Sequence, residues 1–86
     1  MTFQIELAKE AQAGLESLYK SDRTLFRRIL AKIETLMAKP QEGKPLVGNH
    51  KGEYSLRVGN YRIVYEIEYT KRIVYVLTVK HRKHVY

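Results

Sequence analysis

Residues 52–86, GEYSLRVGNYRIVYEIEYTKRIVYVLTVKHRKHVY, decide the fold of this chain. Valine, isoleucine, leucine and tyrosine alternate with polar residues along this stretch, which predicts half-buried antiparallel strands. Gly59-Asn60 stands between two alternating runs and indicates a hairpin with a two-residue loop. We therefore expect a three-stranded antiparallel meander in the second half of the chain.

The two-residue loop predicts a definite strand register. Val58 should face Tyr61, which places Arg57 directly opposite Arg62 on the next strand. Like charges in opposed positions destabilise a sheet. An anion that binds between the two arginines is the best explanation for this arrangement. The alternative is that each side chain reaches solvent or pairs with a nearby glutamate.

Strand alternation also assigns residues to the two faces of the expected sheet. On the arginine face we place the set of the last strand that ends in polar and basic side chains, namely Val74, Val76, Thr78, Lys80 and, beyond the strand, Arg82. In the core we expect the tyrosines Tyr54, Tyr61, Tyr65 and Tyr75.

The first half of the chain changes from a strand pattern to a helical one. Thr2 to Leu7 predicts a strand that joins the same sheet. Helical spacing runs from Ala8 to Lys20, and again from about Asp22 to Lys39 after a cap at Ser21-Asp22. Pro40 should end the second helix.

A loop is expected from Pro40 to Lys51, with Leu46 and Val47 anchoring it to the core. Helices followed by sequential strands indicate an α+β fold. We expect one domain over residues 1–86, consisting of an N-terminal strand, a helical hairpin and the meander. The helices should cover one face of a four-stranded sheet and leave the arginine face open.

Composition narrows the classes of function. The chain has 86 residues, a net charge of +7 and no cysteine, which excludes disulfides and thiolate metal sites. No apolar run is long enough to span a membrane, so we expect a cytoplasmic protein. The positive charge is concentrated after residue 48, where the balance is +5 against +2 before it. This asymmetry favours a polyanion or an acidic protein as partner.

Several residues outside the hairpin are candidates for chemistry or binding. His81 and His84 could act as acid or base, since imidazole titrates near neutral pH. Tyr86 could dock into the core or stack on a base. The lysines that could contact RNA are Lys44, Lys51, Lys80 and Lys83. The exposed cations of the second helix, which either face solvent or contact RNA, are Arg23, Arg27, Arg28 and Lys32. The histidine spacing matches no zinc site, and we expect neither a metal nor a cofactor.

Three motifs together resemble the RelE group of the RelE/ParE toxin superfamily. They are the sequence GKPL at Gly43 to Leu46, the hairpin YSLRVGNYR at Tyr54 to Arg62, and the ending HR…VY at His81 to Tyr86. The resemblance covers essentially the whole chain. It implies a RelE-like microbial RNase fold and the toxin of a type II toxin–antitoxin system.

The resemblance also implies an activity and partners. RelE toxins are ribosome-dependent mRNA endonucleases in which the ribose 2′-OH attacks the adjacent phosphate without a metal. The expected partners are the ribosome, mRNA and a RelB-like acidic antitoxin that wraps the toxin. Two other functions remain open: a ParE-like toxin that binds DNA gyrase and is no nuclease, or an RNA-binding module without catalysis.

Roles in catalysis follow position by position from the resemblance. Arg62 matches an arginine that stabilises charge on the scissile phosphate, and Arg57 matches a basic position on the preceding strand. Arg82 matches a proposed general acid, and Tyr86 matches a tyrosine that positions the RNA. Ser55 stands where some members have a lysine, which leaves the general base open, with His81 and His84 as candidates.

Overall fold

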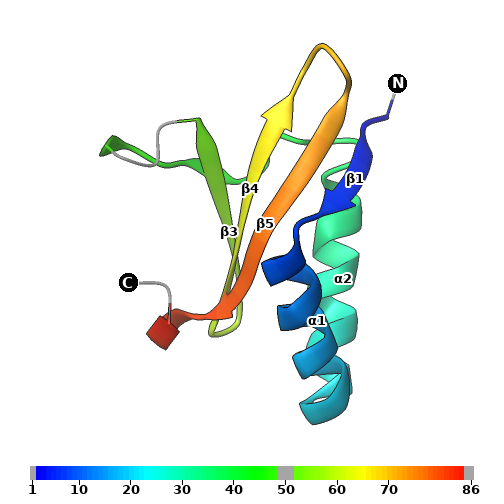
Figure 1. Cartoon of the computed structure of the whole chain (residues 1–86), viewed down its shortest axis with the longest axis vertical. Coiled ribbons are helices and arrows are strands. Elements are labelled where there is room, and N and C mark those ends of the chain that lie inside the picture. The colour runs from blue at the N-terminus through cyan, green and yellow to red at the C-terminus, as the bar shows by residue number, and fades with distance from the viewer. Residues whose placement is uncertain (1, 49–51, 85–86) are drawn as a thin grey trace.

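The computed structural model describes residues 2–48 and 52–84 and confirms the α+β fold (Figure 1). Helices α1 (Lys9–Ser21) and α2 (Arg23–Thr35) form a hairpin that follows strand β1 (Gln4–Leu7). Strands β3 (Glu53–Val58), β4 (Tyr61–Glu68) and β5 (Ile73–His81) make the predicted meander. A 3-10 turn, η2 (Arg82–His84), follows β5. In the described part of the chain, neither helix is long and apolar enough to cross a bilayer.

The sheet has five strands in the order β1-β5-β4-β3-β2, not the four that we predicted. β1 pairs with β5 in parallel, and the other neighbours are antiparallel. The additional strand, β2 (Lys44–Pro45), lies within the segment predicted as a loop and pairs with Ser55 and Tyr54 of β3. Proline has no N–H for a ladder and is therefore confined to sheet edges, which explains why β2 is short and lies outermost.

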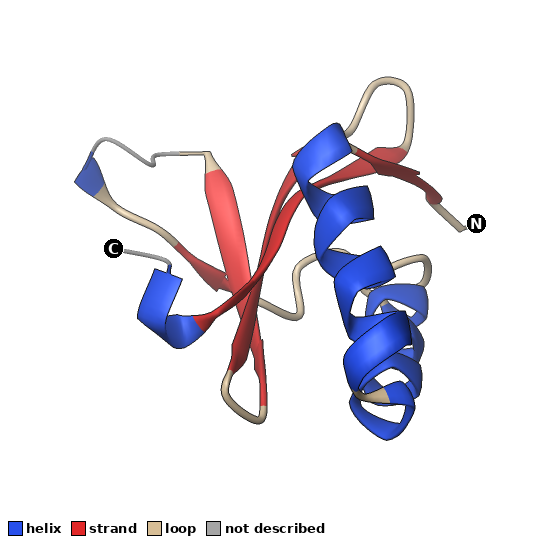
Figure 2. Ribbon diagram, turned by 60° about the horizontal axis from the view of Figure 1, so that its bottom comes forward, coloured by secondary structure: helices blue, strands red, loops and turns tan. Residues whose placement is uncertain are grey.

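Both helices pack on the same face of the sheet (Figures 1 and 2). A Cβ on Gly14 would collide with the backbone carbonyl of Val79, so the glycine lets α1 approach β5 closely. Asp22 caps α2, since its carboxylate accepts a hydrogen bond of 3.1 Å from the N–H of Leu25. The core between helices and sheet consists of Ala11, Leu15, Leu18, Ile29, Ile33, Leu36, Leu56, Val58, Ile63, Tyr65, Val74, Val76 and Val79.

The second helix ends at Thr35, four residues before the predicted end at Lys39. After Thr35 the backbone tightens into i→i+3 hydrogen bonds, from Leu36 N–H to the Ile33 carbonyl and from Met37 N–H to the Glu34 carbonyl. This tighter turn directs Leu36, which is fully buried, into the core. Pro40 is thus not what stops the helix.

A β-bulge in β5 corrects the predicted faces of that strand. Val64 pairs with Thr78 and Tyr65 pairs with Val76, so that Leu77 is an extra residue on β5. One extra residue inverts the alternation that precedes it. Thr78 and Lys80 lie on the arginine face as predicted, whereas Val74 and Val76 are buried under the helices.

The same inversion makes one prediction about the tyrosines wrong. Tyr75 pairs with Glu66 and is half-buried on the open face instead of in the core. Tyr65 is fully buried, as predicted. Tyr54 and Tyr61 are half-buried and pack against the core, and the ring of Tyr54 stacks on that of Tyr65 at 5.5 Å.

The connection from α2 to β2 is held by the phenol of Tyr65. The Tyr65 hydroxyl donates to the Pro40 carbonyl at 2.7 Å and accepts from the Gly43 N–H at 2.9 Å. Burial raises the pKa of Tyr65 above its ordinary value of 10.0, so the hydroxyl keeps the proton that it donates. Of the residues predicted to anchor this segment, Val47 is 85% exposed and Leu46 is only half-buried.

Glu42 ties the same connection to α2. Its carboxylate pairs with the ammonium of Lys32 at 2.8 Å and accepts from the hydroxyl of Thr35 at 3.0 Å. The hydrogen bond from Lys32, and then that from Thr35, holds the pKa of Glu42 below its ordinary value of 4.5. Glu42 is therefore ionised at neutral pH.

The Tyr65→Phe variant should be less stable by about 1–3 kcal/mol, because the buried Gly43 N–H loses its acceptor and Pro40 its donor. Urea unfolding measures this difference. Tyr75→Phe is the matched control, since Tyr75 has no hydrogen bond through its hydroxyl within the described residues. Equal losses of stability in the two variants would contradict the role of the Tyr65 hydroxyl.

A lowered pKa for Glu42 predicts a specific dependence of stability on pH. A depressed carboxyl pKa contributes stability above the unfolded pKa, and that contribution disappears as the pH falls through the folded pKa. The wild type should exceed Glu42→Gln by about 0.2–1 kcal/mol at pH 7, and the difference should shrink below about pH 4.5. Unfolding titrations in urea test this, and Lys32→Met should lose most of the same pH dependence, because only the hydrogen bond from Thr35 then lowers the pKa of Glu42.

Candidate RNA-binding site

The predicted pairing of arginines is present on the open face of the sheet. Gly59 has φ of +58°, which a two-residue II′ turn requires at its first central position. The turn sets Val58 opposite Tyr61 and Arg57 opposite Arg62. Lys80 of β5 continues the row beyond Arg62. Three cationic residues thus occupy equivalent positions on three adjacent strands.

Lys44 belongs to the neighbouring row on the same face. It pairs with Ser55, which pairs in turn with Val64 on β4. Arg57 and Lys44 are exposed, and Arg62 is half-buried. Lys80 is engaged elsewhere, because its ammonium pairs with the carboxylate of Glu10 on α1 at 3.0 Å. Arg57, Arg62 and Lys44 therefore form the centre of the basic surface.

These residues line a pocket of about 360 Å³ on the open face. We call it the arginine pocket, and its lining residues are Glu42, Gly43, Lys44, Ser55, Leu56, Arg57 and Arg62. Arginines and a lysine that converge on one hollow are suited to hold a phosphate.

Sequence reasoning missed Glu42, which adds a carboxylate to the wall of the arginine pocket. Its contacts with Lys32 and Thr35 come from helix α2, and they form only because the chain reverses direction around Pro40. Neither residue spacing nor charge in the sequence signals such a contact. The available signal in the sequence was that Glu42 directly precedes the GKPL motif.

The 3-10 turn η2 brings Arg82 to the hairpin end of the sheet. The Arg82 N–H donates to the carbonyl of Asn60 at 2.7 Å, which ties the first residue of η2 to the turn of the β3–β4 hairpin. Arg82 and Lys83 are both exposed. The structure thus brings Arg82 to the same end of the sheet as Arg57 and Arg62.

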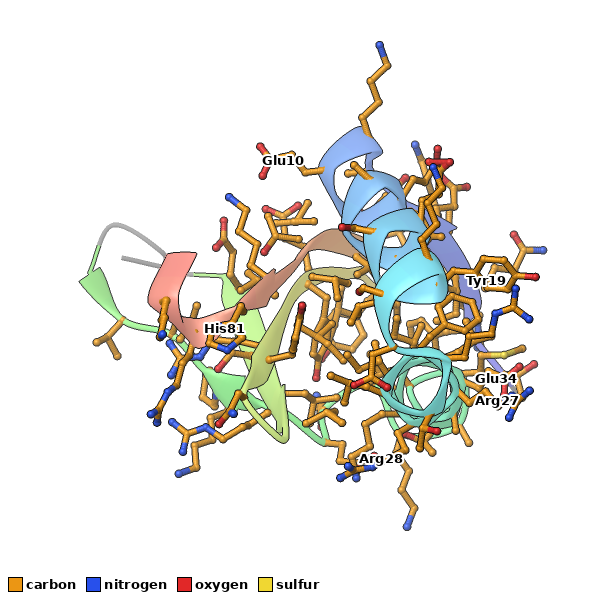
Figure 3. The ribbon with its side chains drawn as sticks, turned by 90° about the horizontal axis from the view of Figure 1, so that it is seen from below. Glu10, Tyr19, Arg27, Arg28, Glu34 and His81 are labelled. Carbon is orange, nitrogen blue, oxygen red and sulfur yellow. The ribbon has the colours of Figure 1, made fainter. Side chains whose placement is uncertain are left out.

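His81 lies on the other face. It pairs with Tyr61, whose ring it meets edge-on at 5.4 Å, and it borders a hollow with Gly14 and Ser17 of α1 (Figure 3). Its Nδ1 accepts the N–H of Lys83 at 3.2 Å, which leaves the proton of the neutral ring on Nε2. The register therefore separates His81 from the row of cations.

Other predicted residues lie outside this description. Tyr86, Lys51 and the side chain of His84 lie outside the part of the chain that the structure describes. No three histidine or acidic side chains within residues 2–48 and 52–84 gather as a metal site would require.

The open face is divided by charge along its length. The hairpin end carries the cations, whereas the opposite end carries carboxylates. Glu53 pairs with Glu66, Glu68 lies further along β4, and Glu6 of β1 pairs with Tyr75. A polyanion is therefore attracted more strongly to the hairpin end than to the opposite end, where Lys71 and Arg72 of the β4–β5 turn follow these carboxylates.

Comparisons with known proteins agree with this architecture. The toxin in the toxin–antitoxin complex RelBE2 from Mycobacterium tuberculosis is 26% identical, with a TM-score of 0.82 over 95% of this chain and 100% of that chain. A YoeB/ParE toxin from Agrobacterium tumefaciens is 19% identical, with a TM-score of 0.83 over 92% and 98%.

The archaeal RelE–RelB complex from Pyrococcus horikoshii gives 23% identity and a TM-score of 0.76 over 99% and 100%. No curated protein matches the sequence. Residues 5–86 match the family described as ParE toxin of type II toxin-antitoxin system, parDE. The chain belongs to this family of toxins, within the RelE/ParE superfamily.

Proposed function

We propose that this toxin is a ribosome-dependent mRNA endonuclease that inhibits translation. The observation that carries the proposal is the arginine pocket, in which Arg57 and Arg62 stand opposite each other without a covering helix. Their mutual repulsion is relieved when a phosphate binds between them. Membership of the family alone supports only the function of a toxin. The proposal of nuclease activity therefore depends on this pocket.

The pocket is suited to cleavage by the neighbouring ribose. The 2′-oxygen attacks the phosphorus, the bond to the 5′-oxygen breaks, and a 2′,3′-cyclic phosphate and a 5′-hydroxyl result. Arg57 and Arg62 stabilise the charge that builds on the phosphoryl oxygens. Arg82, Tyr86 and His84 are the candidates from the sequence for positioning the RNA or protonating the leaving 5′-oxygen. The fourth candidate from the sequence, His81, lies on the other face of the sheet.

A base must accept the proton of the 2′-hydroxyl. Arginine remains protonated at neutral pH and is unsuited to this role. Glu42 is ionised and lines the pocket, but both of its oxygens are engaged by Lys32 and Thr35. Proton transfer is thus weakly supported in the isolated toxin, and much of the rate must come from holding the 2′-hydroxyl in line with the phosphate. Ribosome-bound mRNA supplies that orientation.

The proposed partners are the ribosome, mRNA and an antitoxin. The antitoxins in the complexes from Mycobacterium tuberculosis and Pyrococcus horikoshii support a RelB-like partner for this chain. We expect an acidic segment that orders on binding and covers the cationic end of the sheet. Such a segment would compete with RNA for Arg57 and Arg62.

A gyrase-binding toxin without nuclease activity is the second candidate, because the matched family carries the name ParE. In that case the arginine pocket would bind no scissile phosphate, and its residues would be replaceable without loss of toxicity. The experiment below separates the two functions.

Arg62→Ala should reduce cleavage of mRNA on translating ribosomes by about 10²–10³-fold, because it removes one charge-stabilising group. Arg27→Ala is the control, since Arg27 is an exposed cation on the far side of α2 (Figure 3). Primer extension on ribosome-bound and free mRNA measures the rates. The wild type should cut free mRNA far more slowly, and a 2′-deoxy residue at the cleaved position should block the reaction.

Two results would contradict the proposal. One is a folded Arg62→Ala protein that cleaves as fast as the wild type. The other is a wild-type toxin that arrests growth and inhibits gyrase while mRNA on ribosomes stays intact, which would favour the ParE-like alternative.

A further inference from the structure

A second hollow of about 410 Å³ lies between helix α2 and the tip of the β3–β4 hairpin. We call it the edge hollow, and it is lined by Arg28, Ala31, Lys32, Thr35, Arg57, Val58 and Gly59. Arg57 lines both this hollow and the arginine pocket. The two hollows therefore meet at Arg57, on either side of strand β3.

The edge of β3 is open at this point. β2 covers β3 only at Tyr54 and Ser55, so that within residues 2–48 and 52–84 no strand lies beside the β3 backbone beyond Ser55 on that side. A chain that leaves the arginine pocket beside Arg57 can pass around this edge and reach α2 without crossing another strand.

The charges differ along the edge hollow. Lys32 is paired with Glu42 at 2.8 Å, which compensates its charge. Arg28 is exposed and forms no ion pair with any residue that the structure describes. Arg28 is therefore the group on α2 that adds uncompensated positive charge to the edge hollow.

The other arginines of α2 do not share this position. Arg23 lies over the ring of Tyr19, 4.3 Å from its centroid. Figure 3 shows Arg27 directed to the opposite side of α2 from Arg28, which points toward the hairpin side. Arg27 and Arg28 are neighbours in sequence with the same side chain and similar exposure, which makes them a matched pair.

Charge also distinguishes two of the directions in which a bound strand can leave the arginine pocket. Along the sheet it would meet Glu53 and Glu66, which stand opposite each other on the open face. Around the edge of β3 it meets Arg57 and Arg28, and it passes Glu42, whose carboxylate is paired with Lys32 at 2.8 Å. The second path, which adds Arg28 and has its one carboxylate paired with Lys32, is therefore the more favourable one for a phosphate chain.

We propose that Arg28 binds a phosphate of the substrate RNA, so that the strand runs from the arginine pocket around the edge of β3 into the edge hollow. The occupant is the substrate strand because the hollow continues the pocket at Arg57. This inference rests on the proposed function in one respect, namely that the arginine pocket takes RNA.

Binding of 2′-O-methyl RNA, which cannot supply the 2′-hydroxyl for cleavage, tests the path. For an eight-nucleotide strand, Arg28→Ala should reduce the slope of log K against log salt concentration by about 0.7, the value for one lost phosphate contact on single-stranded RNA. Arg27→Ala should leave the slope unchanged. For a dinucleotide, which fills only the arginine pocket, Arg28→Ala should bind like the wild type.

Three results would overturn the inference. The first is an unchanged slope in Arg28→Ala, and the second is an equal change in Arg27→Ala. The third is weaker binding of Arg28→Ala to ribosomes without mRNA but normal binding to the eight-nucleotide strand, which would assign the edge hollow to ribosomal RNA.

The outcome is independent of the cleavage assay. If the toxin cuts no mRNA but shows the Arg28-dependent slope, the proposed RNA path is supported and the proposed nuclease activity is refuted. If the toxin cuts mRNA but the salt slope of binding does not depend on Arg28, the nuclease activity is supported and the RNA path is refuted. Urea unfolding of both alanine variants verifies that each is folded.

Discussion

The opposed register of Arg57 and Arg62 is the constraint on which the proposed site depends. The two-residue turn at Gly59-Asn60 leaves these side chains no other register, and the docking of η2 on the carbonyl of Asn60 braces the same tip. Such an opposition costs stability in the free protein. We expect a bound phosphate to offset this cost, which would couple the stability of the hairpin to occupancy of the arginine pocket.

The rest of the fold supports this surface from behind. The helices bury one face of the sheet and leave the cations on the other. Tyr65 reaches through the core to hold Gly43, and a Cβ on that glycine would lie 2.7 Å from the Tyr65 hydroxyl. A buried side chain thereby fixes the position of Glu42 and Lys44 in the pocket wall. The phenol of Tyr65 thus connects the packing of the core to the arrangement of the pocket wall.

Local sequence predicted the parts of the structure that depend on local rules. Alternation and the Gly59-Asn60 turn gave the meander and the opposed arginines, and helical spacing with Asp22 gave the two helices. The bulge at Leu77 escaped prediction, because nothing in the alternation of β5 marks one residue as extra. The faces of Val74, Val76 and Tyr75 were therefore assigned wrongly.

Contacts between distant segments could not be predicted in the same way. Glu42 enters the pocket because α2 supplies Lys32 and Thr35 after the chain has turned. The short strand β2 was not predicted, because it contains a proline, which usually indicates a loop. Arg28 differs from Arg27 only in its direction from the helix, which depends on how α2 lies against the hairpin.

A double-mutant cycle of Arg57→Ala and Arg62→Ala, with the free energy of unfolding measured in urea at low salt, tests the central claim most directly. Without added anion, the coupling between the two arginines should be destabilising by about 0.2–1 kcal/mol. With saturating phosphate, and chloride at equal ionic strength as control, the coupling should become favourable. A coupling that phosphate does not change, or one that is already favourable without an anion, would contradict the account.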